Sequence, residues 1–204
     1  MTLRYDSRSR VSTYTQSWVS NADPDFGAFE SIGTVTVGSG GTGSVSFNSI
    51  PQNYKHLQIR TLCKTNRPTY SVDEITYRIN GDTGNNYSAH HVGGTGSAAE
   101  SASSTSYSSI RFGSFMLSTT TVHASMFGGS IIDLLDYTST NKYKTVRTLT
   151  GYDTNATATD YYGYITLSSG LWMNSSAITS MTIYSLSGAS FVQYSQFALY
   201  GIKG

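Results

Sequence analysis

Short runs in which apolar and polar residues alternate recur from about residue 29 to the carboxyl end of the chain. Two of these runs, residues 32–37 and 45–47, flank a glycine-rich segment at residues 38–43. Glycine accepts the backbone angles that tight turns need, so this pattern predicts a hairpin of two strands. Eight more runs predict further strands at residues 57–64, 75–80, 110–117, 124–135, 143–149, 161–167, 178–186 and 197–202.

About ten short strands separated by turns favour an antiparallel β-sandwich with a jelly-roll-like arrangement. No stretch long enough for a helix keeps the apolar spacing of three and four residues that a helix needs. A chain of 204 residues is within the size range of one large β-sandwich. We therefore expect one all-β domain over residues 29–204, in which Phe197, Leu199 and Ile202 bury the last strand.

Residues 1–28 differ from the rest of the chain because they show no regular alternation. Arg4, Arg8 and Arg10 lie there among Ser, Thr and Tyr residues. We interpret this segment as an extended amino-terminal arm closed by a turn. A disordered terminus is the alternative, since chain ends are poorly ordered unless other contacts hold them.

Two segments are rich in turn-forming residues. Residues 80–87 contain glycines and Asn residues around Asp82, which is typical of a tight turn; a weak calcium site is the alternative, although the loop lacks the acidic pattern of an EF-hand. Residues 93–106 are mostly Gly, Ser, Ala and Thr. We interpret them as a long solvated loop, with a mobile binding loop as the alternative.

Composition narrows the range of partners. Charged residues make up 12% of the chain and the formal net charge is +1, so there is no basic surface of the kind that binds nucleic acid or an anionic membrane. No apolar run approaches the length of a membrane span. The single cysteine, Cys63, cannot form an internal disulfide and lies in an apolar run, where we expect a buried, inert thiol.

Candidate catalytic groups are sparse. His90 and His91 are adjacent, so on a strand they would point to opposite faces and could not share one metal ion. Asp133 and Asp136 precede a turn, where Asp commonly bonds to its own backbone; an acid pair of the glycosidase type is the alternative. The sequence contains no nucleophile-elbow, zinc-protease or phosphate-loop lysine motif. We therefore expect a protein that is not an enzyme and that binds no cofactor.

Aromatic residues gather in the last third of the chain. Aromatic rings beside hydroxyl groups can stack on the apolar face of a sugar while polar neighbours bind its edges. The same residues are equally common in cross-strand pairs and in protein interfaces. The residues concerned, taken as a candidate glycan or partner surface, are Tyr161, Tyr162, Tyr164 and Trp172.

Four segments together resemble a β-sandwich module of structural proteins in tailed bacteriophages. They are residues 47–60 (FNSIPQNYKHLQIR), 77–87 (YRINGDTGNNY), 133–137 (DLLDY) with 142–145 (KYKT), and 197–202 (FALYGI). The resemblance covers nearly everything after residue 29 and implies a virion protein of the head-decoration or tail-fibre type. It brings no catalytic residues, and it does not extend to the arm.

This resemblance implies a place on the outer surface of the phage particle. A short arm without a long shaft favours a capsid decoration (cement) protein, expected as a homotrimer by analogy with decoration proteins at three-fold positions. Arg4, Arg8 and Arg10 would then anchor it to the major capsid protein or another virion protein. The alternative is a tail-fibre or receptor-binding module that recognises host surface glycans.

Overall fold

The described residues form antiparallel strands and no helix. The computed structural model describes residues 28–68, 72–117, 125–154 and 163–204. One sheet has eight strands in the order β1 (Phe29–Thr36), β12 (Gln196–Ile202), β3 (His56–Cys63), β8 (Gly128–Leu134), β9 (Lys144–Asp153), β10 (Gly163–Trp172), β5 (Tyr87–Gly94) and β6 (Ala99–Tyr107). The other has four, in the order β2 (Ser44–Phe47), β11 (Met181–Ser185), β4 (Val72–Ile79) and β7 (Ile110–Leu117).

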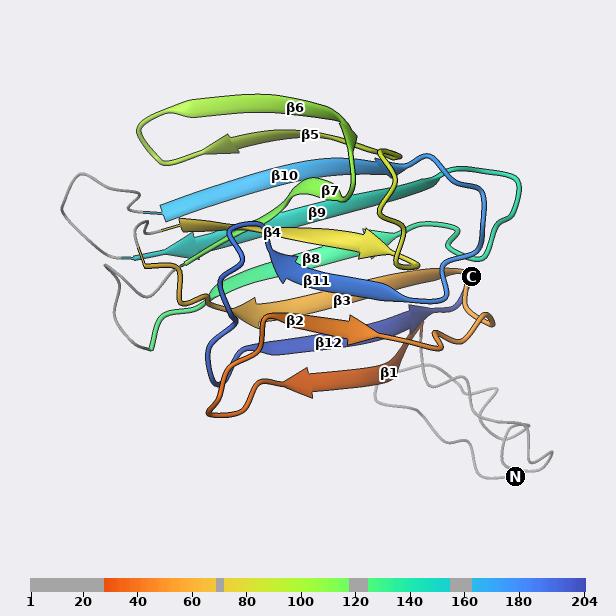
Figure 1. The fold of residues 1–204 in the computed structure, drawn as a ribbon, viewed down its shortest axis with the longest axis horizontal. Helices are drawn as coiled ribbons and strands as arrows, with labels where there is room; N and C mark the ends of the chain where they lie inside the picture. Colours follow the sequence, from red (N-terminus) through yellow and green to blue (C-terminus); the bar gives the residue numbers. More distant parts are fainter. Residues whose placement is uncertain (1–27, 69–71, 118–124, 155–162) are drawn as a thin grey trace, which may run out of the picture.

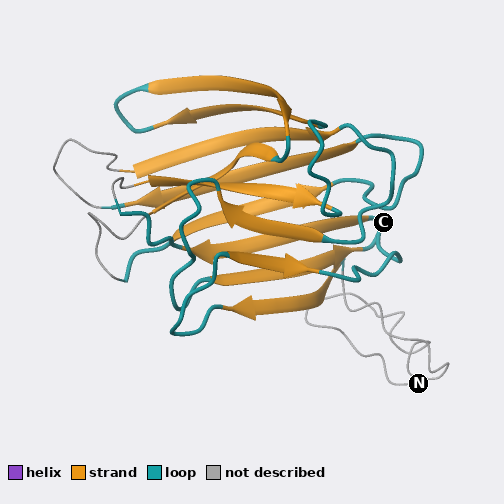
Figure 2. Ribbon diagram, in the orientation of Figure 1, coloured by secondary structure: helices purple, strands orange, loops and turns teal. Residues whose placement is uncertain are grey.

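The two sheets lie face to face, with the four-stranded sheet over the eight-stranded one (Figures 1 and 2). Between them lies a continuous apolar core in which Leu57, Ile59 and Phe197 of one sheet and Tyr77 and Ile183 of the other have no exposed surface. The expected all-β, sandwich-type fold is therefore confirmed. Phe197 and Leu199 of the closing strand β12, which lies between β1 and β3, are buried as predicted. Ile202 is only partly buried, because its side chain lies on the opposite face of the strand.

The predicted hairpin between residues 32–37 and 45–47 is wrong. β1 pairs with β12, whereas β2 pairs with β11 in the opposite sheet. The backbone of Thr42 in the glycine-rich connection exchanges hydrogen bonds of 3.0 and 2.7 Å with the backbone of Phe191. The connection is thus held by a distant segment and crosses from one sheet to the other instead of folding back on its own strand.

The predicted long loop at residues 93–106 is also wrong, because this segment belongs to a β-hairpin. β5 and β6 pair through most of their length, and the Thr95 amide donates to the Ala98 carbonyl across the turn at 3.0 Å. β6 lies at the edge of the sheet, and Ser104 is its single buried residue. An edge strand with so little buried surface needs no apolar alternation, so the pattern that predicted most of the strands is missing here. No strand was predicted for β5 either. The described residues contain twelve strands instead of about ten.

Eight of the strands pair in a nested order. β1 pairs with β12, β2 with β11, β3 with β8, and β4 with β7. The other four strands form two inserted hairpins, β5–β6 after β4 and β9–β10 after β8. β9 joins the large sheet beside β8, and β10 then pairs with β5. The insertions therefore double the width of one sheet and leave the other at four strands.

Candidate interaction surface

A row of exposed aliphatic side chains crosses the outer face of the eight-stranded sheet. Ile131 on β8, Leu149 on β9, Leu167 on β10 and Val92 on β5 occupy directly paired positions on four neighbouring strands. Their side chains lie on the face that points away from the four-stranded sheet and are 40, 48, 55 and 54% exposed. We call these four residues the apolar row.

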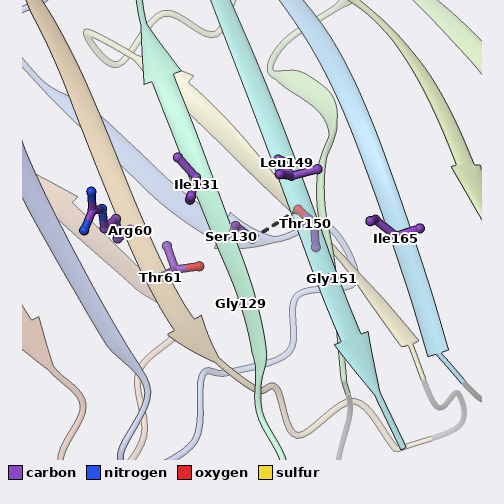
Figure 3. Close-up of a pocket in the computed structure, with 9 residues that line it drawn as sticks. All are labelled: Arg60, Thr61, Gly129, Ser130, Ile131, Leu149, Thr150, Gly151 and Ile165. Atoms are coloured by element: carbon purple, nitrogen blue, oxygen red, sulfur yellow. Dashed lines mark hydrogen bonds between the residues drawn. The ribbon is translucent and has the colours of Figure 1, made fainter.

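A hollow lies beside the apolar row. The next row of paired positions runs from Leu62 through Gly129 and Gly151 to Ile165. The two glycines present no side chain, whereas Leu62 and Ile165 are 49 and 60% exposed. A hollow of about 420 Å³ therefore opens over the glycines, and Ile131, Leu149 and Ile165 stand around it (Figure 3). We call the apolar row together with Leu62, Ile165 and this hollow the apolar face.

Hydroxyl groups occupy the inner face of the same strands. Thr148 and Thr150 on β9, and Thr166 and Ser168 on β10, are buried beneath the exposed leucines. The hydroxyl of Thr150 bonds to that of Ser130 on β8 at 3.1 Å. Strands that cover a core usually place apolar residues inside and polar residues outside. In β9 and β10 this polarity is reversed near the middle of the strand.

The charged residues beside the apolar face have partners within the chain. The Arg60 guanidinium lies over the rings of Phe29 and Tyr200, 5.4 and 5.3 Å from their centroids. Asp133 accepts a hydrogen bond from Gln58 at 2.9 Å and is paired with Arg147 at 3.5 Å. The charges of Asp133 and Arg147 therefore balance each other, whereas the aromatic rings stabilise the Arg60 guanidinium without neutralising it.

The two candidate glycan residues that the structure describes are buried. Trp172 and Tyr164 are only 1 and 4% exposed, so their rings are not open to a sugar arriving from solvent. Trp172 stacks on Tyr87 with a centroid distance of 6.5 Å, and Tyr164 packs against Tyr152. Tyr161 and Tyr162 lie outside the described residues.

The three arginines of the predicted arm, Arg4, Arg8 and Arg10, also lie outside the described residues. Their proposed role in anchoring the chain therefore rests on the sequence pattern alone.

The loop around Asp82 has a structural function. Its carboxylate accepts hydrogen bonds from the Gly84 amide at 2.8 Å, the Asn86 side chain at 3.0 Å and the Trp172 indole at 2.7 Å. The bonds from Asn86 and Trp172 lower the pKa of Asp82. Because N–H donors occupy both carboxylate oxygens, a calcium ion would have to displace them. Among the described residues, no three His, Cys, Asp or Glu side chains are grouped as a metal site.

Asp133 and Asp136 have different partners. Asp136 occupies a turn with a positive φ of 47° and forms ion pairs with Lys55 and Lys142, which lower its pKa. Asp133 lies on β8 in the pair with Arg147. Asp136 therefore lies in a turn as expected, whereas Asp133 lies on a strand. Both carboxylates are held in ion pairs, which the sequence interpretation did not predict.

Two smaller predictions are confirmed. Cys63 is fully buried, and burial raises the pKa of its thiol to about 12, so it is inert as expected. His90 is exposed while His91 is buried, so the two side chains lie on opposite faces of β5.

Sequence reasoning missed the apolar face. In β9 and β10, Leu and Ile alternate with Thr and Ser, which predicts a strand but does not say which set faces the core. Leu149 and Leu167 lie on the exposed face, and the Thr and Ser residues beside them face the core. The available signal is the pairing of glycines with aliphatic residues across strands, and it becomes visible only once the register is known.

No protein-family model matches the chain, and no curated protein or solved structure matches it either. Within the part of the chain that the structure describes, no helix is long and apolar enough to cross a membrane.

Proposed function

We propose that the core of this protein is a jelly roll enlarged by two hairpins. A jelly roll can be described as a long hairpin wrapped around a barrel, so that its first strand pairs with its last and its inner strands pair in nested order. The pairs β1·β12, β2·β11, β3·β8 and β4·β7 support this description. The hairpins β5–β6 and β9–β10 are then insertions that extend one of the two sheets.

We further propose that the chain is a non-enzymatic structural protein of a tailed-bacteriophage particle, most simply a capsid decoration protein on the outer surface. Jelly rolls recur in viral capsid proteins and in lectins. The observation that carries the proposal is the combination of the nested strand order with a broad, exposed apolar face, since a protein of this kind acts through surfaces that assemble. The resemblance to phage structural modules points to the same class.

Within this proposal, the chain acts as a homotrimer bound to the major capsid protein or another virion protein. Arg4, Arg8 and Arg10 supply the anchor, because an extended basic segment can lie along an acidic neighbour or add a strand to it. Replacing the three arginines by alanine in the full chain should reduce the occupancy of particles, measured by quantitative mass spectrometry. Unchanged occupancy would rule out the anchor.

The copy number per particle tests the proposed role. Particles of the phage that encodes this chain should contain hundreds of copies if it decorates the capsid. A handful of copies would place it at the tail, and its absence from purified particles would refute a virion role.

A tail module that recognises host glycans is the alternative. Since Trp172 and Tyr164 are buried, such a site would have to use other aromatic residues. Specific binding on a glycan array would favour this alternative, whereas absence of binding would leave the decoration role in place.

A further inference from the structure

The six aliphatic side chains of the apolar face expose a large area for a single chain. At roughly half exposure each presents roughly 100 Å², so Leu62, Val92, Ile131, Leu149, Ile165 and Leu167 present roughly 600 Å² together. This is the upper end of the apolar patches found on monomeric proteins. A stable protein interface buries about 800 Å² on each partner, and the six side chains alone supply most of that area.

The fold itself does not require these residues on the outside. β9 and β10 bury hydroxyl groups on the face toward the core, so the aliphatic residues of the outer face add little to the packing of one chain. An exposed set of Leu and Ile residues at paired positions lowers solubility unless another surface covers it. This reversal of polarity indicates a surface that is buried in an assembly.

We propose that the apolar face packs against a second copy of this chain. The row formed by Ile131, Leu149, Leu167 and Val92 stands beside the hollow over Gly129 and Gly151, so each copy carries both a raised feature and a recess that can receive one. Such a surface can complement itself. The ion pair of Asp133 and Arg147 beside the face carries no net charge, and Arg60, which is paired in register with Ile131, is held over two aromatic rings. Of these three charges, only the Arg60 guanidinium remains for two copies to accommodate.

Other occupants fit the apolar face less well. Anionic lipid attracts clusters of Lys and Arg, but Arg60 and Arg147 beside the face are already held by aromatic rings and by Asp133. A glycan needs exposed aromatic rings and hydrogen-bonding groups, whereas the residues of this face are aliphatic. This inference is independent of the proposed place on a phage particle, because it concerns contact between copies in solution.

Sedimentation equilibrium of the full chain tests the proposal. The chain should self-associate between about 0.1 and 100 µM, a range that brackets a dissociation constant near 1 µM. Leu167→Asp puts a charge in the centre of the apolar face and should weaken association by at least about 30-fold. Leu186→Asp is the matched control, since Leu186 is 40% exposed and follows β11 of the other sheet. It should associate as the wild type does.

Leu167→Thr removes apolar area while keeping a residue that favours strands. If circular dichroism shows that Leu167→Asp does not fold, Leu167→Thr tests the association instead. Weakened association of a folded Leu167 variant, with Leu186→Asp unchanged, supports the proposal whether the assembly is a dimer or a trimer. A wild-type chain that stays monomeric at 100 µM overturns it. So does a folded Leu167→Thr variant that associates as tightly as the wild type.

Discussion

The eight-stranded sheet has two halves, one containing β12 and β3 and the other containing β9 and β10. Both halves have the same antiparallel backbone pairing, but their side chains serve different purposes. In β12 and β3, the inner face carries Phe197 and Ile59, which are fully buried, and the outer face carries polar residues such as Gln58. In β9 and β10, the inner face carries hydroxyl groups such as that of Thr150, and the outer face carries Leu149 and Leu167. The first half supplies much of the sandwich core, and the second half contributes four of the six side chains of the apolar face.

Both halves are stable within one sheet because backbone hydrogen bonds do not depend on the side chains. The ladder from β8 to β9 to β10 is continuous and free of register shifts. Threonine also favours strands, so a buried row of Thr residues can hold these strands in place without large apolar groups. The outer residues are therefore free to serve an interface.

Loss of β12, which lies in the core half of the large sheet, should have the largest effect on stability. Removing residues 197–204 deletes most of β12, which pairs with both β1 and β3 and buries Phe197 and Leu199. We expect the shortened chain to lose its cooperative thermal transition in calorimetry. Removing Gly204 alone is the control and should leave the transition in place; an unchanged melting temperature in the longer deletion would contradict the fold described here.

Two side-chain substitutions to alanine compare the inner face of the first half with the outer face of the second half. Ile59→Ala should lower the free energy of unfolding by about 2–5 kcal/mol, because it leaves a cavity in the core. Leu149→Ala should change it by less than about 0.5 kcal/mol in a dilute, monomeric sample, since its side chain is half exposed. Urea denaturation measures both, and equal losses would remove the distinction between the halves.

Asp82 links the end of β4 to β10 through Trp172, and its loss should have an intermediate, pH-dependent effect. Hydrogen bonds from Asn86 and Trp172 lower the pKa of this carboxyl in the folded state. Its contribution to stability is therefore present above the unfolded pKa of about 4 and is lost as the pH falls through the lower folded pKa.

Asp82→Asn should cost about 1–3 kcal/mol at pH 6 and should reduce the loss of stability between pH 5 and pH 2. Denaturation curves across this range measure both effects. Asp136→Asn is the comparison, since that carboxylate also has a lowered pKa but is held by Lys142 and Lys55 instead of by Trp172. If Asp82→Asn follows the wild-type pH dependence unchanged, the hydrogen bonds to Asp82 do not stabilise the fold.

The smallest change in stability is expected when a buried hydroxyl group of the second half is removed. Thr150→Val keeps the shape of the side chain but removes the hydroxyl that bonds to Ser130, at a cost of about 1 kcal/mol. The double variant Ser130→Ala with Thr150→Val should recover part of that cost, because neither partner then stays buried without the other. Additive losses in the double-mutant cycle would show that the two hydroxyls act independently.

The alternation of residue types predicted most strands of the sandwich, since a strand that lies on a core must place every second residue against it. It failed for β6, where Ser104 is the single buried residue, and for the partner of β1, which comes from residues 196–202. Alternation identifies a strand but contains no information about which distant strand pairs with it.

The candidate surface could not be located from the sequence for a related reason. On sequence grounds Trp172 fits a glycan surface, a protein interface or a cross-strand pair, and its indole is buried against Tyr87 and donates to Asp82. Leu167 lies on a predicted strand, and its side chain is about half exposed. Which face of a strand is buried depends on the strands that cover it, and in β9 and β10 local residue type points to the wrong face.

Chemical labelling of the apolar face tests the proposed contact between copies most directly. Cys63 is buried with a raised thiol pKa, so a cysteine introduced by Leu167→Cys or Leu186→Cys is the one that reacts with a maleimide. We predict that Leu167→Cys reacts several-fold more slowly at high protein concentration than after dilution, whereas Leu186→Cys reacts at the same rate in both. A Leu167→Cys variant whose labelling rate does not depend on concentration would contradict burial of this face against a second copy.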